Sequence, residues 1–210
     1  MLTIDDARIL YEKADSVHDF SHVLRVLTLA ERLGEREGAD PTIVRTATLL
    51  HDLARADDTE MNLLANQETD HAIIAAGEAR RILAGEPEDF VEAVAHAIKA
   101  HRFRNGIEPT TIEAKVLFDA DKLDAIGAVG IARAFAYGGR LDQPLWGNVS
   151  DDYVPGRGDE PHTANHEFHV KLKKIKDRLY TESGRQMAVQ RHQFMCAFFD
   201  QMAAEVGGER

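Results

Sequence analysis

Apolar side chains recur every three to four residues along most of this 210-residue chain, and the alternation typical of β-strands is scarce. Between residues 19 and 36, for example, the apolar positions are 20, 23, 24, 27, 30 and 33. This spacing gathers them on one side of an α-helix, and that side needs apolar partners to cover it. The pattern therefore predicts an all-α fold, a bundle of helices.

Capping and breaking residues divide this pattern into helices. Asp40-Pro41 is typical of a helix start, because aspartate caps the first turn and proline fits its first position. Gly127 and Gly130 lie inside a helical pattern, where glycine is costly, so we expect close backbone packing or a break near Gly127. The predicted helices are residues 4–13, 19–36, 41–53, 71–83, 88–101, 111–137, 165–180 and 182–206.

A single domain is expected over residues 1–210, with a helical core at about 1–137 and a long loop at about 138–164. Two additional C-terminal helices follow at about 165–206. The loop carries three prolines and five glycines. A loop of this length is either a functional lid or disordered. Its tryptophan, Trp146, either closes over a base or anchors the loop, and we favour anchoring.

Charge and composition narrow the class of protein. A net charge of −11 argues against a broad nucleic-acid surface, which needs clustered cations. It leaves room for a small phosphorylated substrate, because a bound metal supplies local positive charge. No apolar run approaches the roughly 20 residues of a membrane span. The single cysteine, Cys196, is compatible with a reducing cytoplasm, where we expect the protein; the oligomeric state stays open.

The dipeptide His51-Asp52 ends an apolar helical run and places an imidazole beside a carboxylate. Divalent transition metals and Mn²⁺ favour this set of ligands. Taken alone, a His-Asp dipeptide is usually just a helix end. His22 upstream and Asp121 downstream add ligands on other helices, and a metal site inside a bundle is assembled from such dispersed residues.

Three phrases carry a family resemblance: HDFSHVLRV at 18–26, ATLLHD at 47–52 and DADKLDAIGAVGIAR at 119–133. The first places His18 and His22 on one face of a helix. In this order the phrases resemble the HD-domain superfamily of metal-dependent phosphohydrolases, over roughly residues 17–137. The third phrase and residues 181–185 and 191–195 are similar to the stand-alone YedJ/YpgQ-like subgroup. The chain departs from that subgroup at Glu167, which directly precedes Phe168. Members of the subgroup have a histidine at this position, so its role in this chain is open.

The resemblance implies that His22, His51, Asp52 and Asp121 are metal ligands. It implies one divalent ion (Mn, Mg, Co, Ni, Zn or Fe, with Mn favoured), room for a second, and a nucleotide as substrate. The expected enzyme cleaves a phosphoester or phosphoanhydride bond by attack of metal-activated water on phosphorus. Release of pyrophosphate from a nucleoside triphosphate, giving the monophosphate, is one such reaction.

The sequence signal is weaker for the other candidate site residues. Each of them could instead be an ordinary core residue, a helix cap or a solvated surface residue. His96 and His101 lie five residues apart, so they point about 140° apart on a helix and do not readily share one metal. The second-metal or phosphate-binding candidates are His71, His96 and His101. The catalytic candidates are Asp124, Lys122 and Arg55, and the substrate-binding candidates are Arg102, Arg104 and Lys171.

Three other functions compete with this prediction. A phosphodiesterase acting on a cyclic or dinucleotide is the first, although the Tyr-Pro motif of HD enzymes that cleave cyclic dinucleotides is absent. A di-iron oxygenase on the HD fold is the second, and it requires His71 with at least one of His96 or His101 as ligands. The third is a nucleotide sensor without catalysis, and the intact ligand set argues against it.

Overall fold

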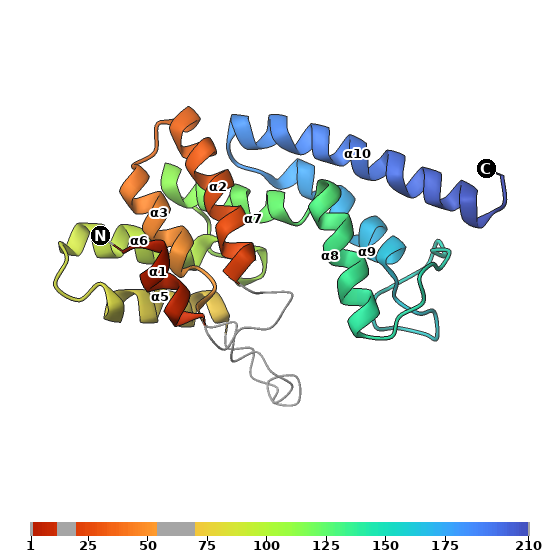
Figure 1. The fold of residues 1–210 in the computed structure, drawn as a ribbon, viewed down its shortest axis with the longest axis horizontal. Helices are drawn as coiled ribbons and strands as arrows, with labels where there is room; N and C mark the ends of the chain where they lie inside the picture. Colours follow the sequence, from red (N-terminus) through yellow and green to blue (C-terminus); the bar gives the residue numbers. More distant parts are fainter. Residues whose placement is uncertain (1, 12–19, 54–69, 210) are drawn as a thin grey trace. The chain divides into compact units, whose positions relative to one another are not determined.

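The computed structural model describes residues 2–11, 20–53 and 70–209, with the side chain of Arg104 excepted. Within this part the chain is helical, and an isolated bridge between Ala84 and Glu86 is the β pairing it contains. The all-α prediction is therefore confirmed (Figure 1). None of the helices described is both long and apolar enough to cross a membrane.

The α-helices are α1 (Ile4–Leu10), α2 (Phe20–Glu37), α3 (Pro41–Leu50), α5 (His71–Ile82), α6 (Glu88–Ala100), α7 (Ile112–Asp124), α8 (Gly127–Arg140), α9 (Ala164–Val170) and α10 (Glu182–Val206). Two short 3₁₀ helices, η2 (Phe103–Asn105) and η3 (Leu172–Arg178), complete the described elements. The chain divides into two compact units. The first comprises Met1–Asp121 and Tyr180–Gly184, and the second comprises Lys122–Leu179 and Arg185–Arg210. The single-domain organisation stays a prediction.

The first unit starts its helices where the sequence predicts caps. Thr3 and Asp6 form a capping box at α1, and the side chains of Asp40 and Asp70 accept backbone N–H bonds at the starts of α3 and α5. Helix α3 packs against both α2 and α6, and α5 packs against α6. As a result the last turn of α3 is buried, with Leu49 and Leu50 fully inaccessible to solvent.

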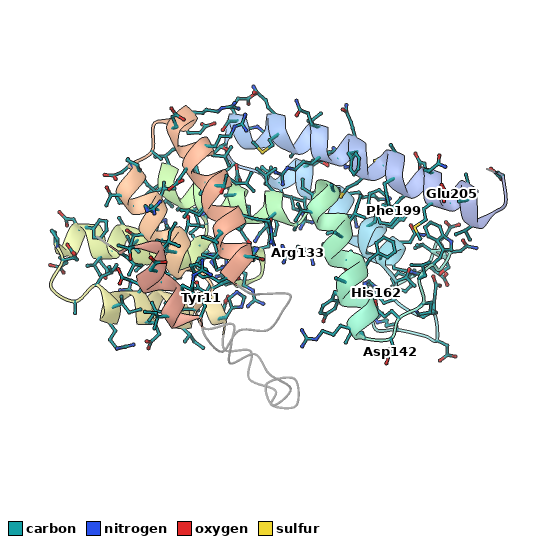
Figure 2. The ribbon with its side chains drawn as sticks, in the orientation of Figure 1. Tyr11, Arg133, Asp142, His162, Phe199 and Glu205 are labelled. Atoms are coloured by element: carbon teal, nitrogen blue, oxygen red, sulfur yellow. The ribbon has the colours of Figure 1, made fainter. Side chains whose placement is uncertain are left out.

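The second unit is built around aromatic side chains of α8, α9 and α10. The ring of Phe199 stacks on that of Phe168 with centroids 4.4 Å apart, and it also stacks on Phe135 at 6.3 Å. Figure 2 labels Phe199 on α10 and Arg133 on α8. Offset or stacked aromatic pairs of this kind add to the stabilisation that burial gives.

The predicted helix at 111–137 is broken, which is one of the two outcomes expected at Gly127. Helix α7 ends at Asp124 and α8 begins at Gly127. Gly127 has φ +76°, a conformation that a side chain would strain, and a Cβ there would lie 3.0 Å from the Cγ of Arg191. The glycine therefore allows the turn and the close approach of α10.

The single helix predicted at 165–180 is wrong. At Lys171 the backbone (φ −133°, ψ −58°) leaves the helical conformation, so α9 ends at Val170 and η3 follows. The apolar positions 168, 172, 175 and 179 fit the α-helical period, and this is why the pattern missed the break. In η3, Leu172 and Ile175 are buried three residues apart, which is the period of a 3₁₀ helix. Smaller shifts occur at the ends of α1 and α3, which are three residues shorter than predicted.

Candidate metal centre

Six of the predicted ligands lie together in the first unit, brought there by five different helices. His22 belongs to α2, His71 is the first residue of α5, and Asp121 lies on α7. His51 and His101 directly follow the last residues of α3 and α6, and Asp52 comes after His51. All are buried except Asp121, which is 14% exposed.

The carboxylate of Asp52 stands between two pairs of histidines. Its Oδ2 lies 3.5 Å from Nε2 of His22 and 3.7 Å from Nε2 of His51. Its Oδ1 lies 3.7 Å from Nε2 of His71 and 3.7 Å from Nε2 of His101. Each oxygen with its two imidazoles forms a group of ligand atoms within 4.8 Å of one another, small enough to hold a metal ion.

Asp121 lies beside the first of these groups. Its Oδ1 lies 3.3 Å from Nε2 of His22. His22 therefore lies beside both carboxylates, and the four residues predicted from the sequence are neighbours. Four protein ligands leave positions open on a metal that prefers five or six, as Mn²⁺ does.

Backbone carbonyls fix the orientation of two of the imidazoles. Nδ1 of His51 lies 2.7 Å from the carbonyl oxygen of Thr48, and Nδ1 of His101 lies 2.5 Å from that of Ile98. A carbonyl only accepts, so each Nδ1 carries the hydrogen and each Nε2 keeps a lone pair. A hydrogen bond from the second ring nitrogen to a fixed acceptor orients a metal-binding histidine.

His51 provides the test of whether these residues suit a metal. Its Nε2 is fully buried and makes no hydrogen bond to any part of the chain that the structure describes. Burial lowers the pKa of the imidazole, although the nearby charge of Asp52 acts in the opposite direction. A neutral imidazole with an unused lone pair in a buried site is the state that a metal ligand needs, so the residues fit a divalent ion.

His71 is the first residue of α5, and the cap of this helix fixes its backbone. Asp70, the residue before it, caps α5 by accepting the N–H of Ala72 at 2.9 Å, and Nη1 of Arg102 donates to the same carboxylate at 3.1 Å. Burial alone would raise the pKa of Asp70, but these two donors hold that pKa below its ordinary value. Arg102, a predicted substrate-binding residue, is thus engaged with the helix cap beside His71.

Tyr11 approaches the same centre from the end of α1. Its hydroxyl donates to the carbonyl oxygen of Leu49 at 3.1 Å, and the side chain is buried. Burial is the main cause that raises the pKa of this phenol well above its ordinary value, and the charge of Asp52 adds to it. A backbone hydrogen bond from Asp52 lowers the pKa by less than these two effects raise it. The phenol is therefore a permanent donor at ordinary pH.

Two other predicted residues, His96 and Asp124, have partners of their own. Nε2 of His96 accepts the backbone N–H of Thr110 at 3.2 Å, and neither group of candidate ligands among the described residues includes His96. In the second unit, Asp124 pairs with Nη1 of Arg133 at 2.7 Å. Asp124 therefore forms a salt bridge, which is the structural role expected as the alternative to a catalytic one.

The remaining candidates lie in the second unit or outside the described residues. Lys171 is exposed and pairs with Glu167 at 2.6 Å, and Lys122 is half-buried in the second unit. His18 and Arg55 lie outside the described residues, as does the side chain of Arg104. Substrate-binding or catalytic roles for these residues stay predictions.

Sequence reasoning assigned no role to Asp119, although it stands in the acidic cluster with Asp121. Its fully buried carboxylate accepts the backbone N–H of Tyr180 at 2.9 Å and that of Thr181 at 2.7 Å. It thereby holds residues 180–184 to the first unit. An aspartate inside an apolar helical pattern indicates a buried carboxylate that needs partners. The partners of Asp119 lie about 60 residues away in the sequence, so a local sequence pattern could not identify them.

With this geometry described, comparison with known proteins gives the family. A model of the HD domain matches residues 19–126, slightly more than half of the chain. The chain belongs to the HD domain family. YpgQ of Bacillus subtilis is 37% identical to it over 199 residues, covering 92% of this chain and 86% of YpgQ. This agrees with the resemblance seen in the three sequence phrases.

Solved structures resemble the chain over nearly its whole length. The crystal structure of B. subtilis YpgQ in complex with ADP matches with a TM-score of 0.74 and 34% identity, covering 98% of this chain and 99% of that one. An HD-superfamily hydrolase from Bacillus thuringiensis matches with a TM-score of 0.70 and 33% identity, covering 97% and 94%. A shorter stretch is 35% identical to ribonuclease Y of Acidothermus cellulolyticus over 116 residues, which cover 55% of this chain and 21% of the ribonuclease.

Proposed function

We propose that this HD protein is a divalent-metal-dependent phosphohydrolase acting on a nucleotide, with pyrophosphate release from a nucleoside triphosphate as the favoured reaction. The observation that carries the proposal is the position of Asp52, whose two oxygens face His22 and His51 on one side and His71 and His101 on the other. Buried carboxylates are seldom surrounded by four imidazoles unless they hold metal.

The residues would hold one ion by His22, His51, Asp52 and Asp121, and a second by Asp52, His71 and His101. A divalent ion supplies Lewis acidity, which lowers the pKa of water and polarises a phosphoryl oxygen. Mn²⁺ is favoured because the ligands mix nitrogen with carboxylate oxygen and include no thiolate.

The chain's own side chains prepare the site for phosphate chemistry. The carbonyls of Thr48 and Ile98 hold the imidazoles of His51 and His101 in the ligand tautomer, so these two residues need not reorient to bind a metal. Of the six predicted ligands, Asp121 is the most exposed, at 14% against 0–3% for the other five. We therefore place the approach of the substrate's phosphate on the side of Asp121.

The nucleotide part of the proposal rests on similarity. YpgQ was crystallised in complex with ADP, and it matches this chain over nearly its full length. Function depends on the residues of a site and not on the fold alone. The proposal that this chain also binds a nucleotide therefore requires that the two proteins share the same site residues. A cytoplasmic location is part of the proposal, since the single cysteine suits a reducing compartment.

The test is the release of phosphate and pyrophosphate from a panel of nucleotides with Mn²⁺, Mg²⁺, Co²⁺ or a chelator. The panel is run with the wild type, Asp121→Ala and His96→Ala, since His96 is a histidine outside both ligand groups among the described residues. Metal-dependent turnover that Asp121→Ala loses and His96→Ala keeps supports the proposal, and the product names the bond. A folded, metal-loaded protein without turnover contradicts it and favours the oxygenase or the nucleotide sensor.

A phosphodiesterase is the second candidate, because the chain matches 116 residues of ribonuclease Y. The same assay distinguishes it when dinucleotides, cyclic nucleotides and short RNA are added to the panel. Cleavage of an internal diester, with no pyrophosphate from triphosphates, would favour this alternative.

A di-iron oxygenase is the third candidate, since His71 and His101 both face Asp52, as that chemistry requires. Metal analysis of the purified protein decides this case. A preparation that contains no iron and hydrolyses nucleotides with Mn²⁺ excludes the oxygenase, whereas two tightly held iron ions and no hydrolysis favour it.

A further inference from the structure

We propose that Tyr11 is a positioning residue for the metal centre, and that its hydroxyl fixes the end of α3 from which His51 and Asp52 project. This inference rests on the proposed function, because it requires a metal bound by these two residues. Tyr11 lies directly after α1 and is labelled in Figure 2.

The end of α3 has carbonyl groups that its own helix does not satisfy. The last four carbonyls of an α-helix have no intrahelical donor. In α3, which ends at Leu50, two of the last carbonyls receive side-chain donors: that of Thr48 receives Nδ1–H of His51, and that of Leu49 receives the hydroxyl of Tyr11 at 3.1 Å. The first donor is a candidate ligand itself, whereas the second comes from the residue after α1 and ties the ligand-bearing turn to that helix.

Packing holds the phenol in place for this contact. Its ring lies 5.4 Å from that of Phe20, centroid to centroid, and it belongs to a buried cluster with Ala7, Leu27 and Leu49. The side chain of Tyr11 is only 6% exposed. The hydroxyl therefore reaches Leu49 from a fixed position, 38 residues away in sequence.

The variant Tyr11→Phe separates the hydroxyl from the packing, because it keeps the ring and removes only the donor. The carbonyl of Leu49 then loses a buried partner, and the turn that bears His51 and Asp52 loses its tie to α1. Loss of a group that hydrogen-bonds a metal ligand directly commonly weakens metal binding by about 10- to 100-fold. Because Tyr11 contacts the carbonyl of Leu49, two residues before the ligand His51, we expect the dissociation constant for Mn²⁺ to rise by about 10-fold, the lower end of that range.

The matched control is Leu27→Val, which removes a methylene from the same buried cluster and changes no hydrogen bond. Loss of a methylene from a core and loss of a buried hydrogen bond destabilise a protein to a similar extent. Both variants are compared with the wild type by calorimetric Mn²⁺ titration without substrate. Thermal unfolding in chelator and the visible absorption spectrum of the Co²⁺-loaded protein are measured in parallel.

The proposal expects weaker Mn²⁺ binding and an altered Co²⁺ spectrum in Tyr11→Phe, with both unchanged in Leu27→Val at a similar loss of thermal stability. Equal effects of the two variants on metal binding would overturn it, because the role of the hydroxyl would then be stability alone. Unaltered metal binding in Tyr11→Phe would also overturn it, while leaving the proposed function intact. A wild-type protein that binds no divalent metal would contradict the proposed function itself.

Discussion

Oδ2 of Asp119 accepts two hydrogen bonds from Thr181, one from the backbone N–H at 2.7 Å and one from the hydroxyl at 2.6 Å. The two residues lie 62 positions apart, and both are buried. Asp119 is also two residues before the candidate ligand Asp121 on α7. The contact therefore connects the return of the chain at residues 180–184 with the helix that carries a ligand.

Replacing this carboxylate should destabilise the protein. Asp119→Asn keeps the shape but removes the charge and places an NH₂ group near donors, so we expect a loss of about 1–3 kcal/mol in the free energy of unfolding. Thr181→Val should cost less, since the backbone donor remains. A double-mutant cycle by urea unfolding measures the coupling, and strictly additive losses would show that the two side chains do not interact.

Glycine substitutions at two positions of the first unit should have opposite signs. A Cβ at Gly184 would lie 2.5 Å from Oδ2 of Asp119 and 2.6 Å from Oγ1 of Thr181, so Gly184→Ala should cost about 1–3 kcal/mol. Gly77, inside α5, has open space around its Cβ position, so Gly77→Ala should stabilise by about 0.5–1 kcal/mol. Thermal unfolding of both variants checks this, and a stabilising Gly184→Ala would contradict the Asp119 contact.

Glu160 should contribute a pH-dependent part of the second unit's stability. Hydrogen bonds from the hydroxyl of Ser150 and from His166 lower the pKa of Glu160 from 4.5 to about 2. Since the folded-state pKa lies below the unfolded one, the contribution is complete above about pH 4.5 and is lost as the pH falls toward 2. Glu160→Gln should therefore lower the melting temperature at pH 7, with a difference from the wild type that shrinks below pH 4.5.

The control for this pH effect is Asp159→Asn, which neutralises an exposed neighbour in the same loop. Its melting temperature should follow that of the wild type across the same pH range. A difference between Glu160→Gln and the wild type that is constant from pH 7 to pH 3 would contradict the assignment of this network.

The number of metal ions should depend on His71. If Asp52 joins two sites, the wild type binds two equivalents of Mn²⁺, and His71→Ala retains one because the other site keeps all of its ligands. His96→Ala should retain two, since the Nε2 of His96 is used by Thr110. Metal analysis after equilibrium dialysis counts the ions, and a single equivalent in the wild type would rule out the dinuclear arrangement.

Local signals in the sequence predicted the helix starts well and the helix ends less well. Thr3, Asp40 and Asp70 cap the helices that they were expected to cap, because a cap involves only neighbouring residues. The end of α3 at Leu50 depends instead on contacts such as that of Tyr11 with Leu49, across 38 residues. No periodicity in the sequence records such a contact.

In the candidate site, too, some residues could be predicted from the sequence and others only from the folded structure. His22, His51, Asp52 and Asp121 were grouped from motif order, and the structure places them together. The sequence could not separate His101 from His96, because two histidines on one helix look alike until the helix is docked. Their surroundings differ, since His101 is 2% exposed and faces Asp52 whereas His96 contacts Thr110.

The most direct test of the account is the Mn²⁺-dependent release of pyrophosphate from a nucleoside triphosphate by the wild type and by Asp52→Asn, with His96→Ala as control. Because the Asp52 carboxylate faces both pairs of histidines, we expect Asp52→Asn to lose activity by at least about 100-fold while remaining folded. His96→Ala should keep wild-type activity. Equal turnover by Asp52→Asn and the wild type would contradict the central claim that Asp52 holds the metal that drives hydrolysis.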